Sequence, residues 1–457
     1  MGFRKGLDAM SKMFELTGIT LKEYRARRSR IIENMPSHSI AILPSGSEKY
    51  RNADAEYPFR QESNFYYLTG FSEPKSLLVL LKRSASESQF ILFCQSHNPA
   101  LEVWTGKKVG LDDALEQFGA DKAYFFDDLD RIMPELLENT NEIFYSLGRH
   151  SDWDARITGW LNTVRAKKKA GGSAPSVFKD LSSTIHESRL FKSAAEIKLM
   201  KKVSEISANA HVELIKACKP NMMEYELEAL FLYECVRQGC RSMAYPSIVG
   251  GGKNACTLHY GANNALLKSS DLVLIDAGGE YQNYAADITR TFPVNGKFTK
   301  EQKVLYQLVL KAQLAAIDLV RPETRWDILQ ETIVTILVQG LVALGLLKGE
   351  VKTLIHEKAH QKFYMHGSGH WLGLDVHDAG EYKLEGQYRT LKPGMVLTVE
   401  PGIYIADGEP SVDKRWWGIG IRIEDDVLVT ENGHDVLTKA APKTVEEIEQ
   451  LMKPILC

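Results

Sequence analysis

The sequence predicts a chain of two domains, an α/β N-terminal half followed by a half that combines long helices with strands. The length of 457 residues exceeds the size at which one hydrophobic core keeps growing. Short apolar runs alternate with helical stretches between residues 39 and 148, and longer amphipathic helices alternate with strands after that. The segment "RAKKKAGGSAPS" (165–176), a charge run that passes into Gly, Ser and Pro, is the expected linker, which places the domains at 1–178 and 179–457.

The strands expected in the N-terminal half are short runs rich in β-branched and aromatic residues. They are "SIAILPSG" (39–46), "SLLVLLKR" (76–83), "SQFILFC" (88–94), "KAYFFDDL" (122–129) and "EIFYSLG" (142–148). The helical pattern "GLDDALEQFG" (110–119) lies between the third and the fourth. Strands that alternate with helices in this way are typical of an α/β domain.

The second half opens with a helix start, because Ser193 followed by Glu196 forms a capping-box pattern before an amphipathic run. We expect helices at 193–218, 222–239, 299–320 and 325–347, and strands at 271–277, 285–292, 395–405 and 419–430. The uncharged run "TIVTILVQGLVALGLL" (332–347) is too short to span a bilayer comfortably, so we expect a buried helix there.

The composition is that of an ordinary soluble protein, with 44% hydrophobic and 25% charged residues. A net charge of −3 and a pI near 6.5 give no reason to expect nucleic acid or membrane as a partner. The six cysteines form no CxxC pair, which is typical of reduced thiols in the cytosol. The opening stretch "MGFRKGLDAMSKMF" (1–14) lacks the apolar core of a secretory signal, so we expect a cytoplasmic protein.

Three of the twelve histidines fall within "HGSGHWLGLDVH" (366–377). His366 and His370 have the i, i+4 spacing that places two imidazoles on one face of a helix, as in a histidine-rich zinc site. The glycines of this stretch argue against a regular helix and therefore weaken that interpretation. The alternative is that one imidazole binds a metal while the others serve a substrate, and the stretch alone leaves both possibilities open.

Four acidic residues interrupt apolar strands of the second half. Asp276 and Asp287 are equidistant from the midpoint 281/282 of a Gly-rich turn, so we expect them to face each other across a hairpin. Glu400 and Glu424 are likewise equidistant from Val412. Buried carboxylates that face one another repel unless a cation lies between them. An oxygen-rich set with one nitrogen, from His370, suits Mn²⁺ or a similar divalent ion, and four carboxylates are enough for two such ions.

These motifs together resemble bacterial aminopeptidase P. The resemblance rests on "IDAGGEYQNYAADITRTFPVNGKF", "HGSGHWLGLDVHD", "LTVEPGIYI" and "GIGIRIEDD", and it extends to "YPFRQESNFYYLTGF" and "LEVWTGKKVG" in the first half. It implies an α/β creatinase-like N-terminal domain and an α+β pita-bread catalytic domain, the fold shared with prolidase, methionine aminopeptidase and creatinase.

The resemblance also implies a role for particular residues. The metal ligands would be Asp276, Asp287, His370, Glu400 and Glu424, with Asp287 and Glu424 bridging two divalent ions, most naturally Mn²⁺, with Zn²⁺ or Co²⁺ possible. His259, His366 and His377 would serve the substrate, and Arg422 would orient the carboxylates. Tyr245 and Tyr404 would form walls of the pocket, and Arg389 with His377 would enclose the proline ring.

The implied reaction is the release of an N-terminal residue from peptides whose second residue is proline. A hydroxide held by the two ions would attack the carbonyl before proline, with Glu400 as the general base. A prolidase-type dipeptidase is the nearest alternative, and a non-catalytic peptide-binding module of the same fold is a more distant one. The resemblance further implies a homotetramer, in which Trp104 and Asp54 reach toward the active site of a neighbouring subunit.

Overall fold

The computed structural model describes residues 18–453 and divides into two compact units, Met1–Arg189 and Leu190–Cys457. The stretch 1–14 considered above lies outside the described residues. The predicted linker at 165–176 lies inside the first unit, because β8 (Val177–Lys179), which follows it, is an edge strand of that unit's sheet. The boundary between the units therefore falls later than the predicted 178/179, at the end of α8 (Ser182–Leu190).

The first unit is built on a six-stranded mixed sheet with the order β6-β5-β4-β1-β7-β8. Its other strands are β1 (Ser39–Pro44), β4 (Leu77–Lys82), β5 (Ser88–Cys94), β6 (Lys122–Phe125) and β7 (Glu142–Phe144). All five lie where the sequence predicts strands. β4 runs antiparallel to β1 and β5, whereas β1 pairs with β7 in parallel.

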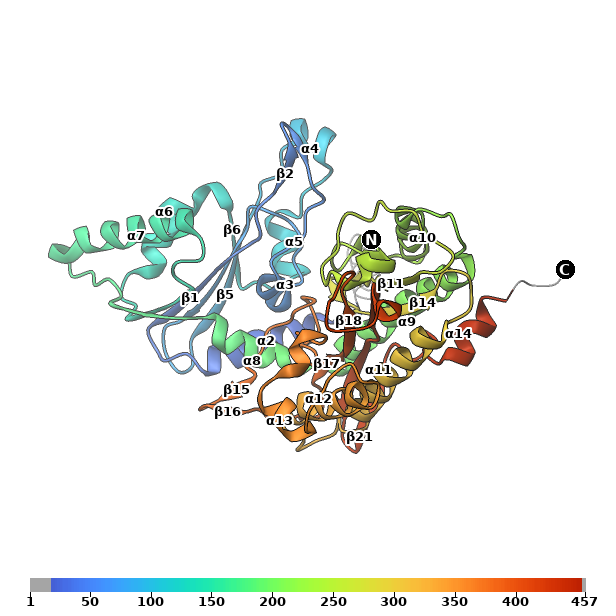
Figure 1. The fold of residues 1–457 in the computed structure, drawn as a ribbon. Helices are drawn as coiled ribbons and strands as arrows, with labels where there is room; N and C mark the ends of the chain where they lie inside the picture. Colours follow the sequence, from blue (N-terminus) through green and yellow to red (C-terminus); the bar gives the residue numbers. More distant parts are fainter. Residues whose placement is uncertain (1–17, 454–457) are drawn as a thin grey trace. The chain divides into compact units, whose positions relative to one another are not determined.

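Helices cover both faces of this sheet (Figure 1). They are α2 (Leu21–Glu33), α3 (Ser63–Thr69), α5 (Gly110–Glu116), α6 (Leu129–Leu137) and α7 (Ser151–Ala166). Side chains that alternate along the strands, such as Ile42, Val79 and Phe93, form one core with α6 and α7. The predicted α/β class of this half is confirmed.

Two exposed features project from the first unit. The hairpin of β2 (Tyr50–Asn52) and β3 (Ala55–Glu56) carries the exposed Asp54 in its turn. Helix α4 (Pro99–Thr105) carries Trp104, which is 85% exposed.

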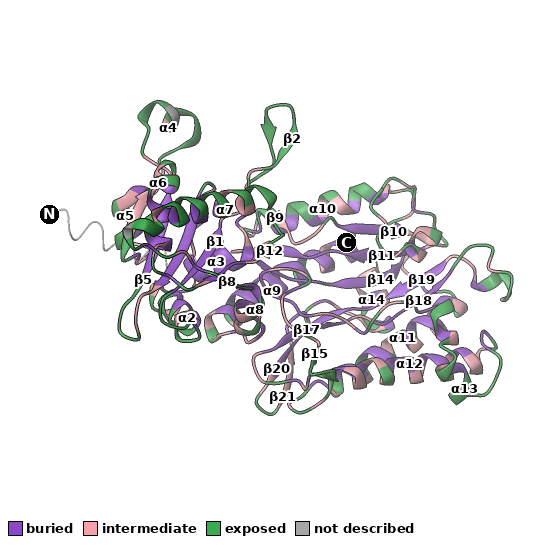
Figure 2. Ribbon diagram, turned by 90° about the vertical axis from the view of Figure 1, so that its left-hand side faces the viewer, coloured by how far each residue is buried: buried purple, intermediate pink, exposed green. Residues whose placement is uncertain are grey.

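The second unit packs helices outside several short antiparallel sheets. Its long helices are α9 (Ala194–Ala217), α10 (Glu224–Val236), α11 (Lys300–Asp318) and α12 (Trp326–Ala343), with the shorter α13 (Val351–His356) and α14 (Val445–Leu451). The predicted capping box at Ser193 and Glu196 starts α9. Figure 2 shows the buried strands between α10 on one side and α11 and α12 on the other.

The strands described in this unit, up to residue 453, form three sheets of three strands and two hairpins. The sheets are β10-β11-β14, β13-β12-β9 and β17-β20-β21, and the hairpins are β18-β19 and β15-β16. Their bounds are β9 (Ser242–Met243), β10 (Ile248–Gly251), β11 (Leu272–Asp276), β12 (Gly279–Tyr281), β13 (Tyr284–Ala285), β14 (Thr289–Pro293), β15 (Lys383–Leu384), β16 (Gln387–Tyr388), β17 (Val396–Val399), β18 (Gly402–Ile405), β19 (Ile419–Arg422), β20 (Asp425–Thr430) and β21 (Gly433–Val436).

Helix α12 is the one described helix whose length and composition would suit a membrane span. Seven of its side chains are buried, and they belong to the main core of the second unit. The helix is therefore a core element, as the sequence predicts.

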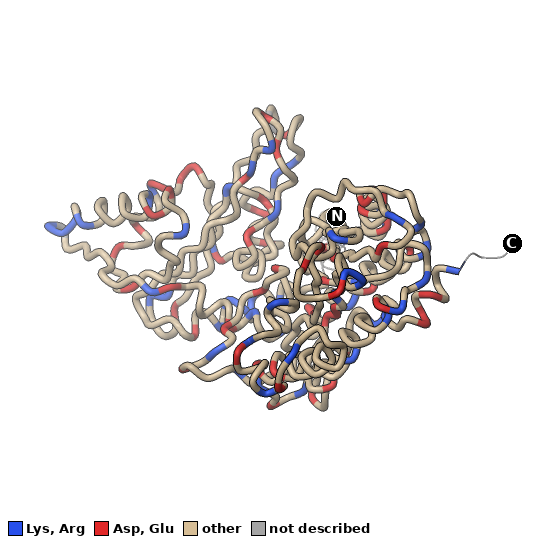
Figure 3. Tube along the Cα trace, in the orientation of Figure 1, with Lys and Arg blue, Asp and Glu red and all other residues tan. Residues whose placement is uncertain are grey.

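Over the described part of the chain, Lys and Arg are interspersed with Asp and Glu in both units (Figure 3).

Candidate metal centre and active site

The first pair of acidic residues lies on the ribbon formed by β11 and β14. Gln282 and Asn283, both with positive φ, form the turn, one residue later than predicted. Asp276 therefore opposes Thr289 and not Asp287, so the predicted register is wrong. Because Asp287 precedes Thr289 by two residues, it is the diagonal neighbour of Asp276 on the same side of the ribbon, where the side chains still come close.

The second pair lies between two hairpin segments that share one register. Val399 pairs with Asp425 in β17 and β20, and Gly402 pairs with Arg422 in β18 and β19. Glu400 and Glu424 lie between these two pairs and continue the same register, so they stand at opposing positions, as the sequence predicts.

His370 lies on an irregular segment beside β17, and residues 366–370 form no regular helix. Its backbone is fixed to Thr398 by two hydrogen bonds: its carbonyl accepts from the Thr398 amide at 2.9 Å, and its amide donates to Thr398 Oγ1 at 3.0 Å. His370 Nδ1 lies 3.0 Å from the Trp371 carbonyl, which can only accept. Nδ1 is therefore the protonated nitrogen, and Nε2 is left free toward the carboxylates.

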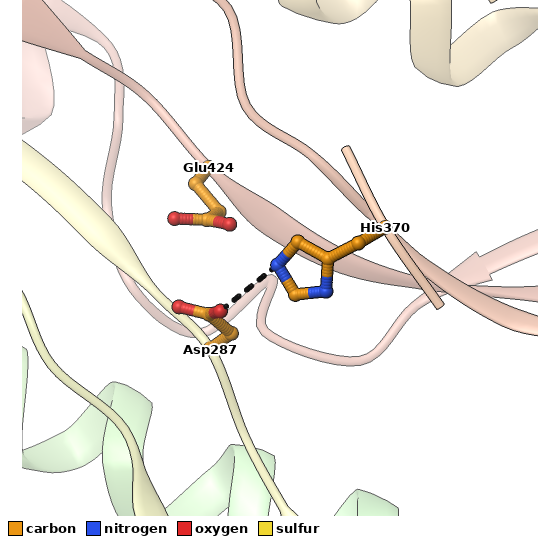
Figure 4. A group of neighbouring side chains, drawn as sticks. All are labelled: Asp287, His370 and Glu424. Atoms are coloured by element: carbon orange, nitrogen blue, oxygen red, sulfur yellow. Dashed lines mark ion pairs between the residues drawn. The ribbon is translucent and has the colours of Figure 1, made fainter. Parts of the chain in front are cut away.

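Asp287, His370 and Glu424 converge to within 4.8 Å of one another, counted between their ligand atoms (Figure 4). His370 Nε2 lies 3.3 Å from Asp287 Oδ2 and 3.8 Å from Glu400 Oε1. Asp276 joins the group through Tyr245, whose hydroxyl lies 2.6 Å from Asp276 Oδ1 and 2.5 Å from Asp287 Oδ1. The structure thus brings all five predicted ligands to one place.

A cavity of about 520 Å³ opens over this group. Its walls include most of the predicted site residues, namely Tyr245, His259, Asp276, Asp287, His366, His370, His377, Glu400, Arg422 and Glu424. Tyr404 contacts the cavity only indirectly, through hydrogen bonds to His366 and Arg422. Arg389 is not among the residues that line the cavity; it is buried, and its Nε donates to the Glu381 carbonyl. Asp54 and Trp104 belong to the other unit.

The electrostatics of the cavity suit a bound cation. Burial raises the pKa of Glu424 well above its usual range, and the neighbouring carboxylates of Asp287 and Glu400 raise it further. Burial also raises the pKa of Asp287, and that of Glu400 to about 7. Burial alone would lower the pKa of His370, but Asp287 and Glu400 outweigh it and raise the pKa to about 9. Burial thus disfavours the charged form of these carboxyl groups, and divalent ions bound among them would compensate that charge.

The contact of Tyr245 with two carboxylates supports the same conclusion. A phenol has one O–H and can donate to only one of Asp276 and Asp287 at a time. The second short contact needs a proton on a carboxyl group or a cation nearby. A set of four carboxylates and one imidazole fits hard or borderline divalent ions, which prefer oxygen ligands with few nitrogens.

A hydrogen-bonded chain links the ligands to the histidines. Arg422 donates to Asp276 at 2.5 Å and to the Tyr404 hydroxyl oxygen at 3.0 Å. Because Arg422 can only donate, the single Tyr404 O–H is directed to His366 Nε2, 2.8 Å away. His366 therefore carries its proton on Nδ1, which lies 3.0 Å from the Gly367 carbonyl. Burial lowers the pKa of His366 to about 4, so it is neutral at physiological pH.

Sequence reasoning missed two residues that support this centre. Thr289 Oγ1 donates to Glu424 Oε2 at 2.7 Å and accepts from Arg422 Nε at 3.1 Å. The carboxyl group of Asp426 accepts the backbone N–H of Asp287 at 3.1 Å. The available signal for Thr289 was its spacing of two residues from Asp287, which places both side chains on one face of a strand.

Comparisons with known proteins agree with this site. Residues 198–431 match metallopeptidase family M24, and residues 24–145 match the aminopeptidase P N-terminal domain. The Xaa-Pro aminopeptidase of Escherichia coli (strain K12) is 44% identical over 439 residues, which cover 96% of this chain and 99% of that protein. The structure of Pseudomonas aeruginosa aminopeptidase PepP matches with a TM-score of 0.93 at 48% identity, over 95% of this chain and 98% of the other.

A second solved structure, Zn-substituted E. coli aminopeptidase P in complex with product, matches with a TM-score of 0.93 at 43% identity, over 95% of this chain and 98% of that one. The expected combination of an α/β N-terminal domain with a pita-bread catalytic domain is confirmed by these matches. The chain therefore belongs to metallopeptidase family M24 and carries the aminopeptidase P N-terminal domain ahead of its catalytic domain.

Proposed function

We propose that this protein is a metal-dependent Xaa-Pro aminopeptidase, which releases the N-terminal residue from peptides whose second residue is proline. The observation that carries the proposal is the convergence of Asp276, Asp287, His370, Glu400 and Glu424 on one cavity, in a chain 44% identical to an Xaa-Pro aminopeptidase. The same five residues would hold two divalent ions. Mn²⁺ suits their oxygen-rich set best, and the Zn-substituted relative makes Zn²⁺ a second choice.

Bound divalent ions would lower the pKa of a water molecule toward neutrality and polarise the scissile carbonyl group. The chain itself supplies the proton transfers. Glu400, with a metal-free pKa of about 7, would take the proton of the attacking water and pass it to the departing proline nitrogen. The Tyr404 hydroxyl and the Gly367 carbonyl hold the His366 ring with Nδ1 3.6 Å from Glu400 Oε2, so that this ring would confine the carboxylate by packing beside it.

The remaining histidines would act on the substrate. His259 lies on the cavity wall and is exposed, so it can donate to the carbonyl oxygen as negative charge develops there. His377 packs edge-on against His370, with 4.3 Å between ring centroids. Together with Leu258 and Val376, it offers an apolar wall. A proline ring, whose amide has no N–H, needs such a wall more than it needs hydrogen-bond acceptors.

The same proposal includes a cytoplasmic homotetramer. The described cysteines are all unpaired, in keeping with a reducing compartment. Val103 and Trp104 on α4 are 83% and 85% exposed, and side chains of this size are enriched in protein interfaces. In the tetramer, Trp104 and Asp54 would narrow the cleft of a neighbouring subunit and so favour peptide ends.

The test is peptide hydrolysis with and without metal. The enzyme, stripped by a chelator and then given Mn²⁺, is offered a dipeptide Xaa-Pro and a longer Xaa-Pro-Yaa peptide of the same first residue. We expect hydrolysis of the longer peptide only after metal is added. Hydrolysis of the dipeptide alone would establish the prolidase-type alternative, and full activity in the stripped protein would overturn the role of the metal.

A further inference from the structure

Glu224 is a fully buried carboxylate that the proposed reaction does not use. It is the first residue of α10, and no ion pair reaches it among the described residues. Burying an unpaired carboxylate is costly unless several donors satisfy it. Its position at the start of a helix of 13 residues favours the negative charge, but the helix dipole alone does not explain why a carboxylate is buried there.

Four hydrogen bonds satisfy both oxygens of Glu224. Oε1 accepts from the Gly251 amide at 2.8 Å and from Asn254 Nδ2 at 2.9 Å. Oε2 accepts from the Tyr260 hydroxyl and from the Ala265 amide, both at 2.9 Å. All four donors belong to one segment, 251–265, and none belongs to α10 itself. The carboxylate thus ties together the beginning, the middle and the end of that segment.

This segment forms one wall of the active-site cavity. Leu258, His259, Tyr260 and Gly261 all line the cavity. Asn263 fixes the same segment from its other side, because its Oδ1 accepts the Val249 amide at 3.0 Å and its Nδ2 donates to the Ser247 carbonyl at 2.8 Å. Between these anchors, the ring of His259 makes no hydrogen bond to any residue that the structure describes, so its position depends on the backbone that carries it.

We infer that Glu224 is a positioning residue of the reaction, which sets the place of His259 in the cavity by holding segment 251–265. The inference deepens the proposed function and rests on it, since it assumes that His259 acts on the substrate. A carboxylate is needed because it offers only acceptors to four donors. A glutamine would turn its NH₂ group toward one backbone amide, that of Gly251 or of Ala265, and lose that hydrogen bond, because a backbone N–H can only donate.

The experiment is a double-mutant cycle on the metal-loaded enzyme, with kcat/KM measured on an Xaa-Pro-Yaa peptide for Glu224→Gln, His259→Ala and the double variant. We expect Glu224→Gln to lower kcat/KM by about 10- to 100-fold, as the loss of outer-shell support does elsewhere, with metal content unchanged. The double variant should be no worse than His259→Ala within about threefold, because both changes disable the same group. If the fold-losses of kcat/KM of the two single variants instead multiply in the double variant, the inference is overturned.

Hydrogen exchange gives a readout that does not depend on activity. Amides of 251–265 should lose protection in Glu224→Gln, and those of α9 and α11 should not. The matched control is Glu226→Gln, an exposed glutamate of the same helical turn whose replacement still accepts the Met223 amide. The control should behave as wild type in both measurements. Unchanged protection in Glu224→Gln would contradict the inference.

If Glu224→Gln fails to fold, Asn254→Ala removes one of the four donors without touching the cavity wall. It should then give a smaller loss of kcat/KM that again vanishes in the His259→Ala background. A wild-type enzyme without activity on Xaa-Pro peptides would refute the proposed function. A wild type active on Xaa-Pro peptides, together with kcat/KM losses that multiply in the double variant, would refute only the role of Glu224.

Discussion

At the scale of single residues, Asp287 and Glu424 are the two carboxylates whose ligand atoms lie within 4.8 Å of each other and of His370. We expect Asp287→Ala or Glu424→Ala to lower turnover by more than about 100-fold, because changes in the outer shell of a metal site already cost about 10- to 100-fold. Each variant should also lose at least one metal ion per chain. Bound metal is measured by elemental analysis beside turnover, and a variant with full metal and near-normal rate would contradict the assignment.

His366 and His377 line the same cavity but stand outside the group of ligand atoms. We expect His366→Ala and His377→Ala each to reduce turnover by on the order of 100-fold, because they position the general base and the substrate, and a misplacement of about 1 Å already costs that much. Bound metal should stay near the wild-type amount. Loss of metal in step with activity would instead favour the histidine-rich metal site.

His370 predicts how the stability of the metal-free protein depends on pH. Its pKa of about 9 lies above the usual 6.5, so the folded state binds its proton more tightly, and this stabilisation is lost as pH rises toward 9. Raising the pH from 7 to 8 should lower the free energy of unfolding by on the order of 1 kcal/mol. His211 and His366, with pKa values near 4, change the stability only below about pH 6.5.

The measurement is urea unfolding of the chelator-treated protein at pH 7 and pH 8. The range stops at pH 8 because buried cysteines such as Cys235, whose pKa burial raises, would add to the loss at higher pH. His370→Gln should reduce the dependence but leave part of it, because Glu400 and Glu424, whose pKa values burial raises, also bind protons in the folded state. Added Mn²⁺ should reduce it further, since the metal displaces the second proton of the imidazole and those of the carboxyl groups. If the free energy of unfolding falls equally between pH 7 and pH 8 in the wild type, in His370→Gln and in the Mn²⁺-loaded protein, His370 is not the cause.

At the scale of elements, a buried polar network fixes the strands that carry the ligands. All five N–H groups of Arg290 in β14 are used: three of its hydrogen bonds reach the carbonyls of Thr289, Glu424 and Ala441, and another reaches Pro442. It also pairs with Asp425 of β20 at 2.7 Å, and both side chains are fully buried. Burial would raise the pKa of Asp425, but Arg290 and Lys443 outweigh it and hold the pKa well below its usual range.

We expect Arg290→Met to lower the free energy of unfolding by about 3–5 kcal/mol, because it removes one of the two cations paired with the buried Asp425, the other being Lys443, and takes the donors from four carbonyl groups. Arg290→Met combined with Asp425→Leu should recover part of that loss. The urea midpoint at constant slope is the measurement. Lys439→Met, which removes the exposed partner of Asp435, is the control and should cost less than about 1 kcal/mol. A double variant as unstable as the sum of the single ones would contradict this account.

At the scale of the whole molecule, the proposed tetramer predicts a solution mass near four times the 51.4 kDa of the chain. Trp104→Ala should reduce that mass at micromolar concentration, or lower activity on Xaa-Pro-Yaa peptides while the fold is kept. Light scattering with a matched activity assay checks both. Tyr225→Ala, which removes a 51% exposed aromatic side chain from α10, serves as a surface control. A fully active wild-type monomer would refute the tetramer.

Several features of this protein were determined by the sequence alone because they depend on local chemistry. The strands of the first unit follow from apolar runs, the start of α9 follows from the Ser193 and Glu196 pair, and α12 follows from its apolar face. The opposing positions of Glu400 and Glu424 could also be predicted, because their spacing about Val412 matches the observed register.

Only the tertiary structure decided features that depend on contacts between distant segments. The turn at Gln282 and Asn283 shifted Asp287 to a diagonal position, since a hairpin's register is set by where the backbone adopts positive φ. The predicted linker became an internal loop because β8 pairs with β7, which lies earlier in the chain. The four donors gathered by Glu224 have no periodic pattern in the sequence, because a buried carboxylate selects its partners by proximity in space and not by spacing along the chain.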